Sequence, residues 1–490
     1  MELNTAIINA AGGGQIEAGK LVGSAAAQVG GEKLRRLLAA ARIQNASDAP
    51  AMPSPPTLLG STAATTGLTV TLRPATAVDP ASRGKPMFAM YGGTPVVSVT
   101  SWKSASVSVP SGGTISAGRS GQGYRIGFRT DATSLDLEFS GASGNQYRVL
   151  VDGVYTSKTA IVSGASGSFF LNAAFATRQA RRIDVEIDAT VTFAGLRCSP
   201  LDMVQRVSSA PRYRIGVFGN SISISTGATI FGNGELQHAA RRLGNMDVDL
   251  VPFGIGGTDY ANDANGASWD VVSHINDINL APAEDGSGFD EVWFRCGIND
   301  ASILAAGTIT AAQLKAKALA AWRGLRTSGF AGPVFVFGPH VKTLSQSQAV
   351  ETVLLDAFME WADPFAKYVP TTQGTILPQS GSAYAAKFTG SVAGTSLTVA
   401  AVASGALAVG QYLHNPALPL GTYIVSGSGT SWVLSQGATI STTTFGAVSP
   451  GTGNFALYGG GTTGQDDTHP SNYGHDNLGS WLAAARAAYA

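Results

Sequence analysis

From about residue 211, short apolar runs alternate with segments that have the composition of helices. Strands are predicted at Tyr213–Phe218, Val248–Phe253, Glu291–Cys296 and Val334–Phe337, and helices at Gly234–Leu243, Ala311–Thr327, Ser347–Ala362 and within Tyr473–Tyr489. This alternation predicts an α/β fold, a parallel sheet with helices on both faces. In open sheets of this kind, ligands bind beyond the carboxyl ends of the strands. We therefore expect the functional residues in the loops that follow the strands.

The rest of the chain has a different character. Residues 1–56 contain a helix-forming stretch, Glu32–Arg42, and a proline-rich segment, and predict an N-terminal helical arm and linker. Residues 57–205 carry short alternating apolar runs between Gly, Ser and Asn clusters, which favours a β-sandwich. Residues 372–458 are rich in Gly, Ser, Thr and Val and predict a small β-domain. It would be inserted between the first part (211–371) and the C-terminal part (459–490) of the α/β domain.

Two alternatives stay open outside the α/β part. The N-terminal arm is either a surface helix or an attachment arm, which leaves a homo-oligomer open. The β-sandwich either binds carbohydrate or is structural.

Composition restricts the partners. With 32 basic and 32 acidic side chains the formal net charge is zero, and no basic tail or stripe predicts nucleic-acid binding. No segment reaches the roughly 18 apolar residues of a membrane span, and the first residues lack the pattern of a Sec signal peptide. Cys198 and Cys296 are too few for a disulfide framework and lack metal-ligand spacing. We expect a soluble protein with no cofactor and no metal.

The first candidate for chemistry is the segment IGVFGNSIS at Ile215–Ser223. An apolar strand ends in Gly-Asn-Ser and continues toward a helix, which would place Ser221 on a tight turn at the edge of the sheet. Taken alone, the same segment fits a helix N-cap serine.

Two further segments supply candidate donors for an oxyanion. VPFGIGGTD runs from a strand into Gly256 and Gly257, either of which offers a backbone N–H. VWFRCGIND ends in Asn299, whose side-chain amide is a suitable donor, although a turn asparagine fits the same pattern. The glycines of VPFGIGGTD do not complete the nucleotide-binding motif G-x-G-x-x-G.

The last candidate is DDTHP at 466–470, just before the final predicted helix. Asp466 and His469 are three residues apart, so the carboxylate can accept from the imidazole Nδ1–H while Nε2 faces a serine. Asp467 fills the same role if the loop is shifted by one residue. His475 falls on the predicted helix, where a surface role is expected.

In chain order these segments read GNS, GIGG, GIND and DDTH, which resembles the SGNH (GDSL-like) hydrolase family. The resemblance covers 211–371 and 459–490, and it implies a serine esterase. Ser221 would be the nucleophile, His469 the base and Asp466 its orienting acid. The backbone N–H groups of Ser221 and Gly257 and the Asn299 amide would form the oxyanion hole.

The family's first block is usually Gly-Asp-Ser, so Asn220 is a departure from the family pattern. Gly257 is preferred to Gly256 because the family glycine usually precedes a small polar or acidic residue.

The substrate is constrained more weakly. The inserted segment resembles short β-repeats of phage tail and prophage proteins, which suggests an extracellular or virion-associated esterase that removes O-acetyl groups from a polysaccharide. A lipase-like or aryl-esterase activity on a small acyl ester is one alternative, and a non-catalytic tail or adhesin protein with a relic hydrolase domain is another.

Tyr260, Trp269 and His340 are candidates for sugar contact, with simple packing as the alternative. Asp259, Asp263 and Asn265 lack a calcium-loop pattern and are interpreted as solvated loop residues.

Overall fold

The structure is a computed structural model of the 490-residue chain. It describes residues 54–80, 84–93, 95–97, 101–104, 123–157, 160–188, 191–207, 213–228, 231–244, 248–263, 268–270, 275, 283, 286–339, 344–372, 385–415, 417–418, 422–448, 458–460, 469–470 and 472–488. The predicted N-terminal arm and most of the linker lie outside these residues.

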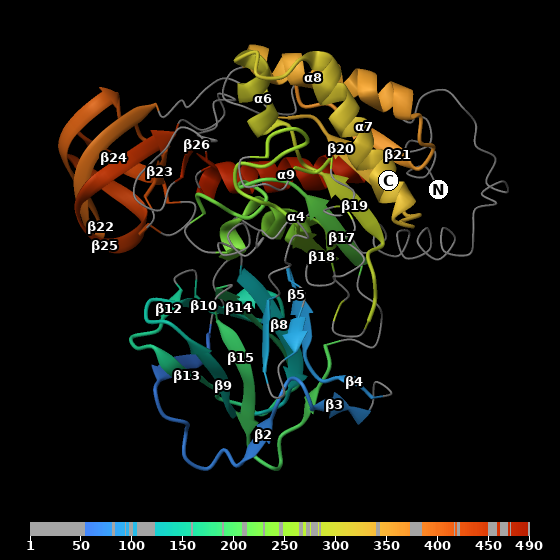
Figure 1. The fold of residues 1–490 in the computed structure, drawn as a ribbon. Helices are drawn as coiled ribbons and strands as arrows, with labels where there is room; N and C mark the ends of the chain where they lie inside the picture. The colour runs from blue at the N-terminus through green and yellow to red at the C-terminus, as the bar shows by residue number, and fades with distance from the viewer. Residues whose placement is uncertain are drawn as a thin grey trace, which may run out of the picture.

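A five-stranded parallel sheet forms the centre of the α/β part (Figure 1). Its strands, in spatial order, are β18 (Val248–Pro252), β17 (Tyr213–Phe218), β19 (Glu291–Phe294), β20 (Val334–Phe337) and β21 (Ala366–Val369). Every neighbouring pair is parallel, and nearly every side chain of β17 to β20 is buried, as expected for strands covered on both faces. The expected α/β class is confirmed.

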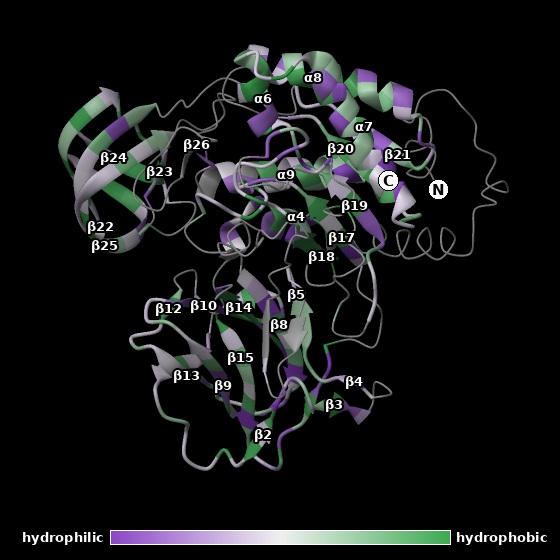
Figure 2. Cartoon of the chain, viewed as in Figure 1, coloured by the Kyte–Doolittle hydropathy of each residue, from purple (hydrophilic) through white to green (hydrophobic). Residues whose placement is uncertain are grey.

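Helices pack on the two faces of this sheet. The helices are α4 (Glu235–Gly244), α6 (Ile298–Ala305), α7 (Ala311–Thr327), α8 (Leu344–Trp361) and α9 (Asn472–Ala488), with a short 3-10 helix η3 (Phe231–Asn233) before α4. The core on one face combines strand residues with α4 and α9, and the core on the other face combines them with α6, α7 and α8. Figure 2 shows hydrophilic and hydrophobic residues alternating along α7 and α8, as amphipathic helices require. Among the described helices, none has both the length and the apolar character of a membrane span.

The strands between residues 57 and 205 form two seven-stranded sheets whose named pairs are all antiparallel. The first contains β1 (Thr57–Ser61), β13 (Gly167–Ala174), β9 (Ser134–Gly141), β15 (Thr192–Cys198), β7 (Trp102–Ser104), β6 (Pro95–Val97) and β2 (Val70–Leu72). The second contains β11 (Val154–Tyr155), β10 (Gln146–Val151), β12 (Ile161–Val162), β14 (Arg181–Asp188), β8 (Gly123–Thr130), β5 (Ala89–Tyr91) and β16 (Val204–Gln205). A separate pair is β3 (Val78–Asp79) with β4 (Lys85–Pro86). One apolar core contains residues of both large sheets, and we call this unit the N-terminal β-domain.

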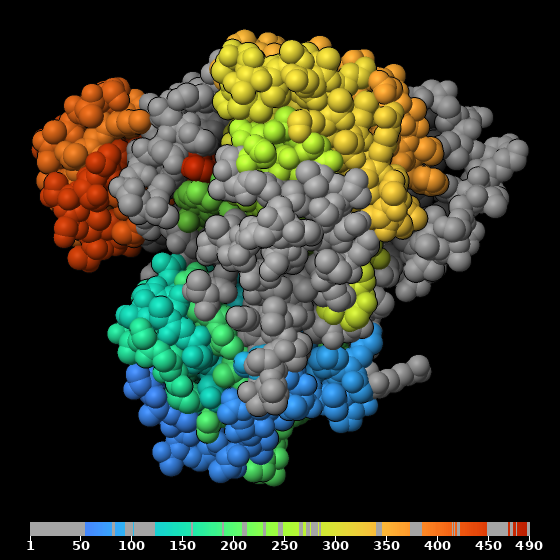
Figure 3. Space-filling model, viewed as in Figure 1, coloured from blue at the N-terminus to red at the C-terminus, as the bar shows by residue number. Residues whose placement is uncertain are grey.

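A second β unit lies between β21 and the end of the α/β part. It contains β22 (Ala386–Gly405), β23 (Tyr412–His414), β24 (Ile424–Ser428) and β25 (Ser431–Val448), all paired antiparallel, around its own apolar core. Figure 3 shows the described atoms of this unit as a lobe at the side of the α/β part. The chain then returns through β26 (Tyr458–Gly460) and β27 (His469–Pro470), which pair with each other ahead of α9. The inserted unit therefore separates His469 from the parallel strands in sequence but not in space.

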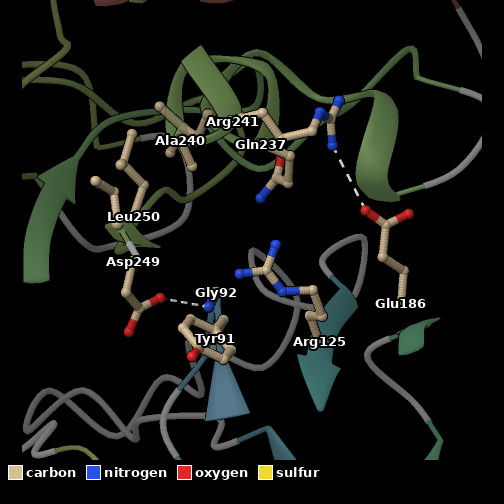
Figure 4. Close-up of a pocket in the computed structure, with 11 residues that line it drawn as sticks. Tyr91, Gly92, Arg125, Glu186, Gln237, Ala240, Arg241, Asp249 and Leu250 are labelled. Carbon is tan, nitrogen blue, oxygen red and sulfur yellow. Dashed lines mark hydrogen bonds and ion pairs between the residues drawn. The ribbon is translucent and has the colours of Figure 1, made fainter. Parts of the chain in front are cut away.

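The N-terminal β-domain is joined to the α/β part by buried polar contacts. Arg148 Nη1 donates to Asn233 Oδ1 of η3 at 3.1 Å, and the Gly92 backbone N–H donates to Asp249 Oδ1 of β18 at 2.6 Å. A cavity of about 30 Å³ remains between the two units, lined in part by Arg125 (Figure 4). That volume corresponds to about one water molecule. These contacts hold the two units together, and this cavity, as the described residues line it, is too small for a substrate.

Glu186 is the central charge of this interface, and its replacement by glutamine is expected to destabilise the fold. Its carboxylate accepts from Arg148 Nε at 2.9 Å and from Tyr155 Oη at 2.8 Å, and it lies 3.5 Å from Arg241 Nη1 of α4. Removing one member of a buried ion pair typically costs about 3 kcal/mol. We expect Glu186→Gln to lower the free energy of unfolding by that amount at pH 7, measured by urea denaturation.

The effect of Glu186→Gln should depend on pH. Burial raises the pKa of the Glu186 carboxyl, but the charges of Arg148 and Arg241 outweigh burial and lower it below the usual range. The carboxylate therefore stabilises the fold above the unfolded pKa of about 4.3, and this contribution is lost as the pH falls through the lower folded pKa. The difference between wild type and variant should shrink in acid. The exposed ion-pair residue Glu360 is the control, and an equal effect of Glu360→Gln would contradict the interface role.

Candidate active site

Ser221 lies on a sharp turn at the carboxyl end of β17. Backbone bonds from the Ile224 N–H to the Asn220 carbonyl (3.3 Å) and from the Thr226 N–H to the Ser221 carbonyl (3.0 Å) fold the chain back on itself. Residues 221–227 form successive turns, and α4 begins only at Glu235. The alternative of a helix N-cap serine is therefore wrong, and Ser221 is presented by a turn, while the helix predicted at Gly234–Leu243 corresponds to α4.

The turn before Ser221 has no room for a larger residue at Gly219. A Cβ built on Gly219 would overlap the Ser223 side chain, so only glycine fits without a shift of the turn. Trp269 Nε1 donates to the Gly219 carbonyl at 3.0 Å, and its ring packs against Phe218 at 5.1 Å between centroids. The nucleophile turn is thus held from within the core.

His469 reaches Ser221 from the other end of the chain. Pairing of β26 with β27 places Gly460 opposite His469 and Tyr458 opposite Pro470, directly ahead of α9. In this position His469 Nε2 lies 3.0 Å from Ser221 Oγ, although 248 residues separate them in sequence. That distance is within the range for a nucleophile and its general base. When the serine hydroxyl donates to Nε2, the ring proton resides on Nδ1.

Three of the predicted site residues lie outside the described residues. Asp466 and Asp467 fall between β26 and β27 in the sequence, and His340 follows β20 in the sequence. The choice between the two carboxylates as the partner of His469 therefore stays a prediction from the sequence.

The two loops expected to carry oxyanion donors both lie at the same edge of the sheet. Gly256 is next to the serine, because a Cβ built on it would be 4.0 Å from Ser221 Cβ. Gly257 has a φ of 73°, which favours glycine at this position. Asn299 lies in the first turn of α6, and its Nδ2 donates to the Thr258 carbonyl at 3.3 Å. An amide carries two N–H bonds, and among the described residues only Thr258 accepts from this side chain.

Asp259 connects these loops. It is fully buried, so its interpretation as a solvated loop residue is wrong. Its Oδ1 accepts from Asn220 Nδ2 at 3.0 Å, and its Oδ2 accepts from the Asn299 backbone N–H at 2.5 Å. Asn220 Oδ1 in turn accepts from the Ile222 N–H at 3.1 Å. The asparagine that departs from Gly-Asp-Ser thus accepts locally through its carbonyl, and it also donates to a carboxylate.

A second buried carboxylate, Asp300, lies beside this network. It accepts the backbone N–H groups of Tyr260 (3.1 Å), Ala261 (2.9 Å) and Asn262 (2.9 Å), so the loop after Asp259 wraps around it. Burial raises the pKa of Asp300 to about 6, and the three N–H donors limit the rise. Burial and the charge of Asp300 raise the pKa of Asp259 well above its usual range. A further carboxylate would be unfavourable here.

Tyr260 and Trp269 are not available to a sugar. Both side chains are fully buried in the core between the sheet and α7, which contradicts their assignment as substrate contacts. Trp322 Nε1 donates to Tyr260 Oη at 3.2 Å, and Trp269 donates to Gly219 as described above. Their role is to pack behind the site, because an apolar ring is more stable in the core than on the surface.

His475 is also buried, and the expected surface role is wrong. Its Nδ1 accepts from the Glu235 backbone N–H at 3.2 Å, and its Nε2 lies 3.0 Å from the Thr226 carbonyl. The ring therefore links α9 to the start of α4 and to the turn after Ser221. Its spacing of six residues after His469 gave no sign of this role.

The sequence matches no protein-family model and no curated protein. Solved structures do resemble the chain. The salicylyl acyltransferase SsfX3 from a tetracycline biosynthetic pathway has a TM-score of 0.52 and 12% identity, covering 84% of this chain and 96% of that chain. A family two carbohydrate esterase from Cellvibrio japonicus has a TM-score of 0.46 and 12% identity, covering 64% and 89%. At this identity the first likeness is one of fold, and the chemistry must be argued from the site.

Proposed function

We propose that the protein is a serine esterase that hydrolyses O-acyl esters, with Ser221 as nucleophile and His469 as general base. The observation that carries the proposal is the 3.0 Å contact between His469 Nε2 and Ser221 Oγ at the carboxyl end of a parallel sheet. A lone serine or a lone histidine is common, but a pair within hydrogen-bond reach is the arrangement that nucleophilic catalysis requires.

In the proposed reaction, Ser221 Oγ attacks the ester carbonyl carbon while His469 Nε2 takes the hydroxyl proton. The negative charge on the carbonyl oxygen is stabilised by the N–H groups of Ser221 and Gly257 and by the Asn299 amide. When the oxyanion collapses, His469 gives its proton to the leaving alcohol and an acyl-serine remains. Water then attacks the acyl group, His469 takes a proton from the water, and that proton returns to Ser221 as the carboxylic acid leaves.

Asp466 completes the proposed triad. Its carboxylate would accept from His469 Nδ1–H, which fixes the tautomer and stabilises the imidazolium formed during each proton transfer. The support is its spacing of three residues before His469 in the sequence.

The proposed substrate is an O-acetyl ester, most simply on a polysaccharide, in an extracellular or virion-associated setting. The support is the sequence resemblance together with the weakly charged inserted segment, in which Lys387 is the one Lys, Arg, Asp or Glu between residues 372 and 458. The likeness to an acyltransferase fold adds an alcohol as a second acyl acceptor beside water, because an acyl-serine can react with either.

The substrate class is tested with a series of p-nitrophenyl esters and with acetylated xylan. We expect kcat/KM to be highest for the acetyl ester and to fall with longer acyl chains, and we expect acetate release from the glycan. Rates that rise with acyl length would favour the lipase-like alternative. Product esters formed on adding an alcohol would show transfer, and a wild type inactive on all esters would favour the non-catalytic alternative.

A further inference from the structure

The buried contacts between the nucleophile turn and the oxyanion loop form one continuous chain of hydrogen bonds. The Ile222 N–H donates to Asn220 Oδ1, Asn220 Nδ2 donates to Asp259 Oδ1, and the Asn299 N–H donates to Asp259 Oδ2. Asn220 is 3% exposed and Asp259 is 0% exposed, so water has little access to replace a lost partner. This chain of hydrogen bonds joins the residues on either side of Ser221 to Asn299, the proposed oxyanion donor.

We propose that Asp259 is a positioning residue that acts through Asn220 and Asn299 to hold the nucleophile and the oxyanion donor at a fixed separation. The inference rests on the proposed function and adds a residue that does not touch the substrate. A displacement of about 1 Å in such a site can cost roughly 100-fold in rate.

The order of donors and acceptors in this chain is constrained at both ends. Backbone N–H groups can only donate, so each side chain must present an oxygen outward, to Ile222 on one side and to Asn299 on the other. Between the two side chains one N–H must meet one oxygen. One amide and one carboxylate satisfy these conditions in either order. Two amides place N–H against N–H, and two carboxylates place oxygen against oxygen unless they share a proton.

Three variants test this order. Asp259→Asn creates two amides, and we expect kcat to fall about 100-fold with KM changed by less than about threefold. Asn220→Asp creates two carboxylates beside Asp300, and we expect a similar loss at pH 8. At lower pH a shared proton relieves the repulsion, so the loss relative to wild type at the same pH should become smaller.

The double variant N220D/D259N exchanges the two side chains and restores one amide and one carboxylate. We expect its kcat to return to within about tenfold of wild type, which is a coupling that independent sites do not show. Full recovery is not expected, because the exchange removes the longer contact from Asn220 Nδ2 to the Arg295 carbonyl (3.4 Å).

A matched control distinguishes positioning from loss of a buried carboxylate. Asp136 in the N-terminal β-domain is also fully buried, and it accepts from Asn172 Nδ2 at 2.8 Å and from the Thr65 N–H at 2.6 Å. Asp136→Asn removes the same kind of acceptor away from the site. We expect it to lower the thermal unfolding temperature and to leave kcat unchanged.

Two results would overturn the inference while leaving the proposed function intact. One is an Asp259→Asn variant that behaves like Asp136→Asn, with lower stability and wild-type kcat. The other is a folded N220D/D259N variant no more active than the weaker single variant, and this second result decides the matter if a single variant does not fold. A wild type without turnover, and without reaction of Ser221 toward a fluorophosphonate, would instead overturn the proposed function and this inference with it.

Discussion

Alanine at His469 is expected to lower kcat for p-nitrophenyl acetate as far as alanine at Ser221 does, by about 10⁴-fold to 10⁶-fold. The reason is that the two side chains act as one unit across a 3.0 Å contact, so removing either abolishes the same acylation step. The double variant should therefore be no less active than either single variant. Initial rates over a range of ester concentrations, with KM determined for each variant, measure this.

His414→Ala in the inserted β unit is the control for general effects of removing a histidine, and it should keep the wild-type rate. A Ser221→Ala variant with wild-type turnover would remove the nucleophile assignment. If the double variant lost activation free energy equal to the sum of the two single losses, His469 and Ser221 would contribute to different steps, which contradicts the mechanism.

Asparagine at Asp466 is expected to lower kcat by about 10⁴-fold, because an amide in place of the orienting carboxylate favours the wrong imidazole tautomer. Asparagine at the neighbouring Asp467 should change kcat by less than about tenfold. Both substitutions remove one charge, at neighbouring positions in the sequence, so each serves as the control for the other. The reverse pattern would assign the role to Asp467, and unchanged rates in both variants would show that His469 works without either carboxylate.

The parallel sheet was predictable because its signal is local. Buried parallel strands are short apolar runs, and amphipathic helices have a clear period. The predicted Tyr213–Phe218 and Ala311–Thr327 coincide with β17 and α7. Helix α6 was not predicted, because it begins only a few residues after β19 and the Gly-Ile-Asn-Asp sequence that starts at Gly297 also fits a turn.

In the N-terminal β-domain, strands β13 and β15 have a weaker sequence signal than the parallel strands of the α/β part. Both carry Gly, Ala and Asn next to their apolar residues, which weakens the alternating pattern. Their pairing with β9 is a long-range property, and no local window of sequence contains it.

The site residues also fall into those that the sequence predicted and those that it did not. Ser221 and His469 were predicted from short segments, and the fold brings them together. The buried positions of Asp259 and His475 were not predicted, because burial depends on contacts between loops far apart in sequence. Tyr260 and Trp269 were misassigned for the same reason, since an aromatic residue in a loop sequence looks alike whether it faces solvent or the core.

The most direct test of the central claim is the site of covalent modification by a fluorophosphonate, which forms a stable adduct with an activated serine. Peptide mass spectrometry after the reaction should place the adduct on Ser221. It should be absent in Ser221→Ala and form far more slowly in His469→Ala. Two results would contradict the account. One is an adduct on another residue. The other is a wild-type protein that hydrolyses acetyl esters but is neither modified nor slowed by the fluorophosphonate.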